Sequence, residues 1–216
     1  MIEHQQFGLL NAITFTCDVP ERTIILFHGY GSNEKDLFSL RSDLLKNANY
    51  ICFRAPIALP WGGYAWFSLE QHGNGEISFN DDEMRASVVK VSNAMLAVSQ
   101  SHLLKGDVII GGFSQGVTMA QIEAVLTPSK YRGLLFLSGR YPDKLNELNA
   151  DLSKMNHWKI FIGHGINDTV LPIGNGRKLN TEWQKTPAEV EYHEYEMEHS
   201  IHPIEIRHIN EWMDKL

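Results

Sequence analysis

The chain has 216 residues, of which 43% are hydrophobic and 21% charged, a balance typical of a folded globular protein rather than a disordered or fibrous one. Its 19 basic and 26 acidic residues leave a net charge of −7, and without a basic run this argues against a nucleic-acid partner. At about 150 residues per domain, the length predicts one domain over residues 1–216.

The cysteines and the N-terminal segment predict the compartment. Cys17 and Cys52 lack a CxxC spacing, so they indicate neither a disulfide framework nor a zinc site. The first ten residues carry no Lys or Arg ahead of their apolar residues, and no apolar run reaches the ~18 residues that a transmembrane helix needs. We therefore expect a cytoplasmic protein without an integral membrane segment, and the sequence does not specify its oligomeric state.

Short β-rich runs recur along the chain. A weak candidate within the first twenty residues, at 12–17, predicts an antiparallel edge strand. The stronger runs are short enough to be buried strands, and they lie at residues 23–27, 50–53, 108–110, 134–137, 159–162 and 190–195.

Helical patterns separate these runs. Apolar residues at 84, 88, 91, 95 and 98 form one stripe, which predicts a helix that starts with a capping box between Asn80 and Glu83. A second stripe ends the chain, with Pro203 in its first turn. Strands alternating with helices predict an α/β fold, a mostly parallel sheet with helices on both faces, in which catalytic groups lie at the carboxyl ends of the strands.

One motif between a strand and a helix is typical of a nucleophile. Gly-Phe-Ser-Gln-Gly at residues 112–116 follows an apolar run and precedes a helical stretch. Small residues two positions before and after Ser114 suit a strained turn that other backbone segments approach closely. The alternative is a glycine-rich turn in which Ser114 only caps the helix.

A serine nucleophile needs a base and an acid that orients it. Asp168 follows the run at 159–162, and Asp143 is the rival acid after the preceding run. For the base, His199 and His202 both follow the last run, and spacing favours His199 only slightly because His202 could cap the last helix. The order Ser114, Asp168, His199 is the one expected of an α/β-hydrolase fold.

Two further segments have predicted roles around this serine. The backbone amides of Tyr30, in a glycine-containing turn after residues 23–27, and of Gln115 are the expected oxyanion donors. Residues 61–67 concentrate aromatic side chains and glycines, and we expect Trp61 and Tyr64 to contact substrate. Trp66 and Phe67 are more readily interpreted as core residues.

With these residues in place, the sequence resembles the phospholipase/carboxylesterase family of small α/β-hydrolases, which includes acyl-protein thioesterases. The resemblance covers nearly the whole chain and implies a catalytic triad of Ser114, Asp168 and His199, with oxyanion amides at Tyr30 and Gln115. It rests on IILFHGYGSNEKDL at 24–37, AP at 55–56, GYAWFSL at 63–69, GFSQG at 112–116, HGINDTVLP at 164–172 and MEHSIHP at 197–203.

The expected function is that of a serine carboxylesterase acting through an acyl-enzyme on short to medium acyl esters, with no metal or cofactor. An acyl-protein thioesterase or a lysophospholipase is the alternative within enzymes, with an acylated protein or a lysophospholipid as partner. A catalytically silent binding protein on the same fold is the alternative outside them. The sequence departs from the family pattern at Val117, where a second glycine is usual, and at Glu198 and Ser200 on either side of His199.

Overall fold

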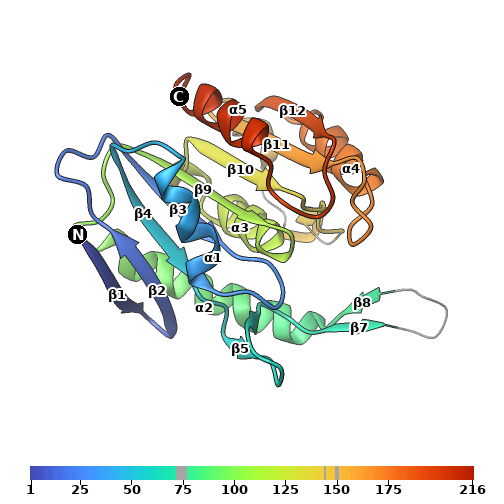
Figure 1. Cartoon of the computed structure of the whole chain (residues 1–216), viewed down its shortest axis with the longest axis horizontal. Helices are drawn as coiled ribbons and strands as arrows, with labels where there is room; N and C mark the ends of the chain where they lie inside the picture. The colour runs from blue at the N-terminus through green and yellow to red at the C-terminus, as the bar shows by residue number, and fades with distance from the viewer. Residues whose placement is uncertain (72–76, 144, 149–150) are drawn as a thin grey trace.

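A central sheet organises the molecule, shown in a computed structural model that describes residues 1–71, 77–143, 145–148 and 151–216 (Figure 1). Eight strands of the described chain form this sheet in the order β1-β2-β4-β3-β9-β10-β11-β12. They are β1 (Ile2–Phe7), β2 (Leu10–Phe15), β3 (Arg22–Phe27), β4 (Ala48–Phe53), β9 (Asp107–Phe113), β10 (Gly133–Leu137), β11 (Lys159–Gly165) and β12 (Glu189–Tyr195).

The sheet is parallel from β4 to β12 and antiparallel only at the β1-β2-β4 edge. The predicted α/β fold with a mostly parallel sheet is therefore confirmed. All six apolar runs expected as strands lie in parallel strands, and the weak candidate at 12–17 lies largely in β2. Strands β4 and β10 are buried along their whole length, which explains why both are largely apolar; Asn49 in β4 is the polar exception, and its side chain is hydrogen-bonded.

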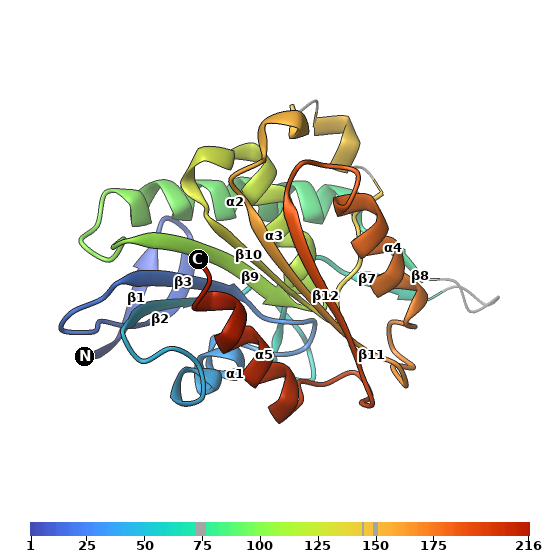
Figure 2. The same cartoon turned by 90° about the horizontal axis from the view of Figure 1, so that it is seen from above.

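Helices cover both faces of the sheet, as Figure 2 shows. One face carries α2 (Asp81–Ser99), α3 (Gln115–Leu126) and α4 (Gly174–Trp183), and the other carries α1 (Glu34–Ser39) and α5 (Pro203–Met213). Short 3-10 helices occupy Leu40–Ser42, Pro128–Lys130, Leu145–Leu148 and Leu152–Lys154.

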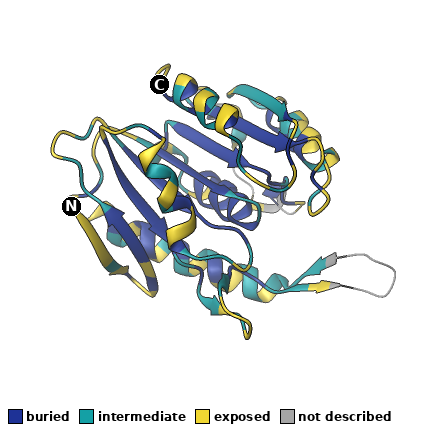
Figure 3. Ribbon diagram, in the orientation of Figure 1, coloured by how far each residue is buried: buried dark blue, intermediate teal, exposed yellow. Residues whose placement is uncertain are grey.

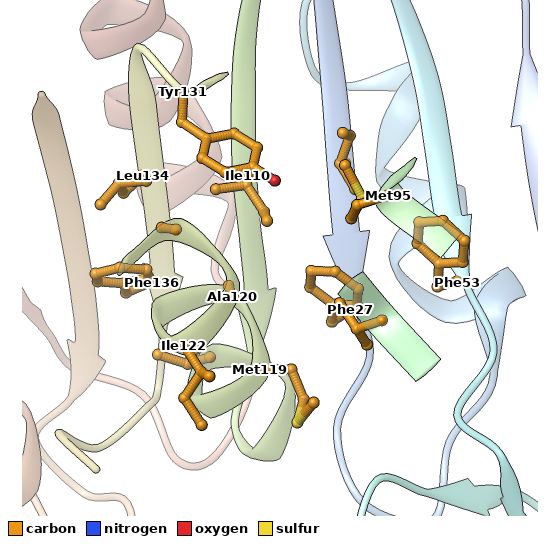
Figure 4. Packing of buried hydrophobic residues seen from close by; sticks show 14 of the residues in the cluster. Phe27, Phe53, Met95, Ile110, Met119, Ala120, Ile122, Tyr131, Leu134 and Phe136 are labelled. Carbon is orange, nitrogen blue, oxygen red and sulfur yellow. The ribbon is translucent and has the colours of Figure 1, made fainter. Parts of the chain in front are cut away.

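The buried side chains form one apolar cluster on each face of the sheet. Val91 and Met95 of α2 belong to the first cluster, and Ile209 and Trp212 of α5 belong to the second. The central strands of the sheet and the inner sides of the helices are buried, whereas edge strand β1 and the outer sides of the helices are largely exposed (Figure 3). Figure 4 shows the first cluster, in which Phe27 and Phe53 from neighbouring strands stack with ring centroids 5.7 Å apart. These contacts fix the strand ends from which the site is built.

The N-terminus of α2 differs from its predicted capping box. The Asn80 side chain accepts a hydrogen bond from Glu83 N, as expected, but the Glu83 carboxylate accepts from Ser68 N instead of reaching back to Asn80. A tertiary partner in the preceding segment has replaced the local one. Two small antiparallel pairs precede α2, formed by β5 (Ile57–Ala58) with β6 (Tyr64–Ala65) and by β7 (Leu69–Gln71) with β8 (Ile77–Phe79).

Candidate active site

Ser114 lies at the sharp turn between β9 and α3. Its backbone φ is 53°, a value that residues other than glycine rarely adopt. The turn brings its neighbours very close to other backbone: a Cβ on Gly116 would lie 1.9 Å from Phe27 O. Ser114 N donates to Leu137 O on the adjacent strand. A strained, half-buried serine at the carboxyl end of a central strand has the geometry of a nucleophile elbow.

Asp168 and His199 come together after the last two strands of the sheet. His199 Nδ1 lies 2.6 Å from Asp168 Oδ2, while Asp168 Oδ1 accepts hydrogen bonds from Val170 N and Leu171 N. The carboxylate is fully buried, and the imidazole is 15% exposed. Because an ionised carboxylate only accepts hydrogen bonds, His199 Nδ1 carries the proton, which leaves its Nε2 able to accept one.

His199 also lies beside the serine turn, with its ring centroid 4.8 Å from that of Phe113. Within the described residues, neither Ser114 Oγ nor His199 Nε2 makes a hydrogen bond. Catalytic hydrogen bonds are often long or poorly aligned in sites without substrate and tighten when it binds.

Backbone hydrogen bonds hold the acid and base loops together. Ile166 N donates to Tyr195 O, and Asn167 N donates to Met197 O, so the loop after β11 runs alongside the loop after β12. These bonds follow directly from the parallel pairing of β11 with β12. The sheet register therefore determines which carboxylate reaches which imidazole.

His164 is a second imidazole near Asp168, and sequence reasoning assigned it no role. Its Nε2 lies 2.8 Å from Leu171 O and 3.5 Å from Asp168 Oδ2. Burial lowers the pKa of His164, and a carbonyl can only accept, so the neutral ring donates from Nε2 to Leu171 O. His164 thus supports the Asp168 loop through its hydrogen bond to Leu171 O.

The amides expected to bind an oxyanion belong to segments that meet at the serine turn. A Cβ on Gly29 would lie 3.4 Å from Ser114 Cβ, so the loop that carries Tyr30 lies against the serine. Tyr30 N and Gln115 N donate no hydrogen bond to any other described residue. Gln115 is also the first residue of α3, where the helix dipole favours negative charge.

A buried hydrogen-bond network fixes this loop. His28 Nδ1 donates to Gly29 O at 2.7 Å, and His28 Nε2 accepts from Ala55 N at 3.0 Å, so both ring nitrogens are satisfied. The Trp66 indole donates to His28 O. The Gln115 side chain bridges the same region, because it accepts from Trp66 N and donates to Phe67 O.

The rival residues are engaged elsewhere. His202 Nδ1 accepts from Ile204 N as the N-cap of α5. The Asp143 carboxylate is 60% exposed and binds Lys178 and Arg140. The hydrogen bond from Lys178 contributes most to lowering the pKa of Asp143, and Arg140 lowers it further. His193 lies within β12, where its Nε2 donates a hydrogen bond to Glu191 Oε1 at 3.0 Å.

A pocket of about 710 Å³ opens beside α3, within the range usual for small-molecule sites. It lies between α2, α3, β8 and the segment after β10, and Thr118, one helical turn after Ser114 along α3, is among its lining residues. Its apolar lining is Phe67, Phe79, Met84, Val88, Val89, Ile122, Leu126, Pro142, Leu145 and Leu148. Sequence reasoning missed this pocket because its lining comes from four separate segments, and Met84 and Val88 were expected to be core.

Trp61 and Tyr64 lie outside that lining. Trp61 is 71% exposed on the turn between β5 and β6, and Tyr64 packs its ring on the Arg54 guanidinium. The turn lies beside the loop of Tyr30, because Gly31 N donates to Tyr64 O. Trp66 and Phe67 are buried in the first apolar cluster.

No described group of His, Cys, Asp and Glu residues could hold a metal ion. Nor does any described helix combine the length and apolar character that crossing a bilayer requires.

Comparisons with known proteins identify the family of the chain. The family model described as phospholipase/carboxylesterase matches residues 11–216. Acyl-protein thioesterase 1 of Debaryomyces hansenii is 28% identical over 85% of each chain, and that of Saccharomyces cerevisiae is 26% identical over 90% of this chain and 92% of the relative.

Solved structures share the fold at lower identity. A carboxylesterase from Mesorhizobium loti superposes with a TM-score of 0.82 at 17% identity, covering 100% of this chain and 99% of that one. Acyl-protein thioesterase 2 of Zea mays gives a TM-score of 0.74 at 22% identity, covering 94% and 97%. The expected α/β-hydrolase fold and the resemblance in sequence are both confirmed.

Proposed function

We propose that this chain, which belongs to the phospholipase/carboxylesterase family of hydrolases, is a serine esterase that works through an acyl-enzyme intermediate. The hydrogen bond of 2.6 Å between Asp168 and His199, beside a serine with a φ of 53°, carries the proposal. The three side chains come from the ends of three strands, and their chain order is typical of α/β-hydrolases.

In the acylation step, Ser114 Oγ attacks the carbonyl carbon of the ester while His199 Nε2 takes the hydroxyl proton. Asp168 holds the Nδ1 proton of His199 and stabilises the imidazolium that forms. The carbonyl oxygen becomes an oxyanion, for which the Tyr30 and Gln115 amides are the donors. The tetrahedral intermediate then expels the alcohol, which receives its proton from His199.

Deacylation repeats these steps with water. His199 Nε2 removes a proton from a water molecule as its oxygen attacks the acyl carbon, and Ser114 Oγ leaves with the proton that His199 returns. The products are a carboxylic acid and the regenerated serine. No metal or cofactor takes part in either half of this proposal.

The substrate is proposed to be a carboxylic ester with a short to medium acyl chain. Two apolar surfaces beside the serine turn are candidates for holding that chain: the Trp61 and Tyr64 turn, and the pocket lined by Met84 and Ile122. Apolar surface gains about 0.8 kcal/mol for each methylene it buries, so the rate should rise over the first acyl carbons.

A thioester substrate is the second candidate, because the curated relatives are named acyl-protein thioesterases. The attack by serine is the same for both bonds, and only the leaving group differs. An acylated protein would then be the partner, with a lysophospholipid as the third possibility within the same chemistry. The cytoplasmic location and the single domain expected from the sequence stay predictions.

Labelling with a fluorophosphonate probe tests the mechanism. The wild type should be labelled at Ser114, and Ser114→Ala should not be labelled. Ser99→Ala is the matched control, since Ser99 is an exposed serine on α2 and its loss should leave labelling intact. Label that persists in Ser114→Ala would contradict the assignment, and an unlabelled wild type would favour a silent binding protein.

A substrate panel then separates the two leaving groups. Oxygen esters and thioesters with the same acyl chain should be compared by kcat/KM on the wild type. An esterase is expected to prefer the oxygen esters or treat both alike. A preference of more than tenfold for the thioesters would replace the ester proposal with the thioesterase one.

A further inference from the structure

Glu205 is a buried carboxyl group six residues beyond the proposed base in the chain, and the mechanism above does not use it. It is the third residue of α5 and is fully buried. Its Oε2 accepts a hydrogen bond from His202 N at 3.4 Å, while its Oε1 has no partner among the described residues. A buried polar atom without a partner is costly, so its retention calls for an explanation.

The position of Glu205 joins the two ends of the His199 loop. That loop runs from the end of β12 at Tyr195 to the N-cap of α5 at His202. Glu205 reaches the α5 end through His202 N, and its carboxyl group packs against Gly163 of β11, next to the Tyr195 ring. A Cβ on Gly163 would lie only 2.0 Å from Glu205 Oε1, so β11 leaves room for this one group.

Strand β11 also leads to the Asp168 loop. The Glu205 carboxyl group therefore contacts the strand that positions the acid and the loop that positions the base. We propose that Glu205 is a positioning residue for His199, which holds the loop at 196–202 against β11 so that the imidazole meets Asp168. This inference rests on the proposed function, in which His199 is the base.

The protonation state of Glu205 gives this role a signature. Burial raises the pKa of Glu205 to about 8, and the hydrogen bond from His202 N offsets this only in part. Below that pH the group is a neutral acid that fits its apolar site. Above that pH the buried carboxylate is charged and has no cation beside it. Its hydration then requires the loop to move away so that water can enter.

Three titratable groups lie near Glu205. Tyr195 on β12 has its pKa raised by burial, so it stays neutral through the range. His208 bonds to the Tyr195 hydroxyl, and His202 is the N-cap of the helix. From β11 the facing residue is Gly163, which has no side chain.

The experiment compares Glu205→Gln with Glu211→Gln, which removes an exposed carboxylate from the same helix. In the wild type and in Glu211→Gln, kcat/KM should fall about tenfold between pH 7 and pH 9, as the neutral fraction of an acid with a pKa near 8 does. Glu205→Gln should match the wild type at pH 7 and stay level to pH 9. Parallel profiles in all three proteins would overturn the proposal, as would a loss of more than tenfold at pH 7 in folded Glu205→Gln.

A second readout needs no turnover. The proton on His199 Nδ1 in its bond to Asp168 should give a downfield NMR resonance, identified by its loss in His199→Gln. It should fade above pH 8 in the wild type and persist in Glu205→Gln. If the chain proved inactive on every ester, this resonance would still decide the role of Glu205. Should Glu205→Gln not fold, Glu205→Met serves in both measurements, because Met fills the site and cannot ionise.

Discussion

Two imidazoles flank the serine turn, and their surroundings are built in opposite ways. His28 is 1% exposed, with a hydrogen bond at each ring nitrogen, one to Gly29 O and one from Ala55 N. The His199 side chain is 15% exposed, and among the described residues it bonds only through Nδ1, to a buried carboxylate. A ring with both nitrogens satisfied holds a loop in place, whereas a ring with one nitrogen oriented and the other available can move a proton.

The difference extends to charge. Burial lowers the pKa of His28, and the described residues around it supply backbone groups in place of a carboxylate contact. Asp168 lies 2.6 Å from His199, and in the proposed mechanism this carboxylate stabilises the imidazolium that forms. The comparison shows how partners distinguish two histidines beside one turn: His28, bonded at both ring nitrogens, holds a loop, and His199, bonded at one to a carboxylate, is the proposed base.

The largest effect on activity should come from removing the proposed base or the proposed nucleophile. His199→Ala and Ser114→Ala should each lower kcat by about 10⁴ to 10⁶, because the triad acts as a unit. His202→Ala should stay within about tenfold of the wild type, since it loses only a helix cap. Steady-state kinetics on one activated ester would check all three. An active His199→Ala beside a dead His202→Ala would reverse the comparison.

The carboxylate that orients His199 should rank next. Asp168→Asn should lower kcat by about 10⁴, because an amide favours the wrong tautomer of the ring. Asp143→Asn is the matched control, since that carboxylate binds Lys178 and Arg140 at the surface. Its kcat should remain close to that of the wild type, and the opposite result would move the acid to the segment after β10.

The structural histidine should affect stability before chemistry. His28→Leu leaves Ala55 N–H buried without its acceptor, which should lower the free energy of unfolding by about 1–3 kcal/mol. His4→Leu, at an exposed position in β1, should change it by less than about 0.5 kcal/mol. Urea unfolding at pH 7.5 measures both variants. Equal losses of unfolding free energy would show that the hydrogen-bond network around His28 does not contribute to stability.

The pH dependence of stability sharpens the same point. Because the folded-state pKa of His28 is lowered, the unfolded chain binds more protons below about pH 6.5, and stability falls as the pH falls. His28→Leu should lack this part of the loss, so its slope below pH 6.5 should be shallower by up to about 1.4 kcal/mol per pH unit. Identical slopes for the two proteins would contradict a buried neutral His28.

The smallest effect concerns the two candidate acyl surfaces. If Trp61 holds the chain, Trp61→Ala should flatten the rise of kcat/KM with acyl length, a loss of about fourfold per methylene at 0.8 kcal/mol each. If the pocket holds the acyl chain, Ile122→Trp should shorten the preferred acyl length, and Trp61→Ala should change the dependence of kcat/KM on acyl length little. An ester series of increasing acyl length distinguishes them, and an optimum on long-chain triglyceride would exclude the preference for short to medium esters.

Sequence reasoning succeeded where the signal was local or repeated. The strand runs, the helix at 81–99 and the turn around Ser114 were all readable because alternating apolar runs and a glycine-flanked serine encode them directly. It failed at α4, whose first residues include Gly174 and Gly176. That helix is held by Leu179 and Trp183 packing into the core, which no local propensity reveals.

What the sequence determined by itself was the α/β order of elements and a short set of candidates: one serine, two acids and two histidines. Only the tertiary structure shows which of these candidates lie together, because the parallel register of β11 and β12 brings Asp168 to His199 while α5 takes His202 as its cap. The surroundings of Val117 are likewise visible only in the tertiary structure. Its side chain is buried against Gly139, where a Cβ on that glycine would lie 2.4 Å away. Partners far apart in sequence are chosen by packing and strand register, and a linear pattern carries neither.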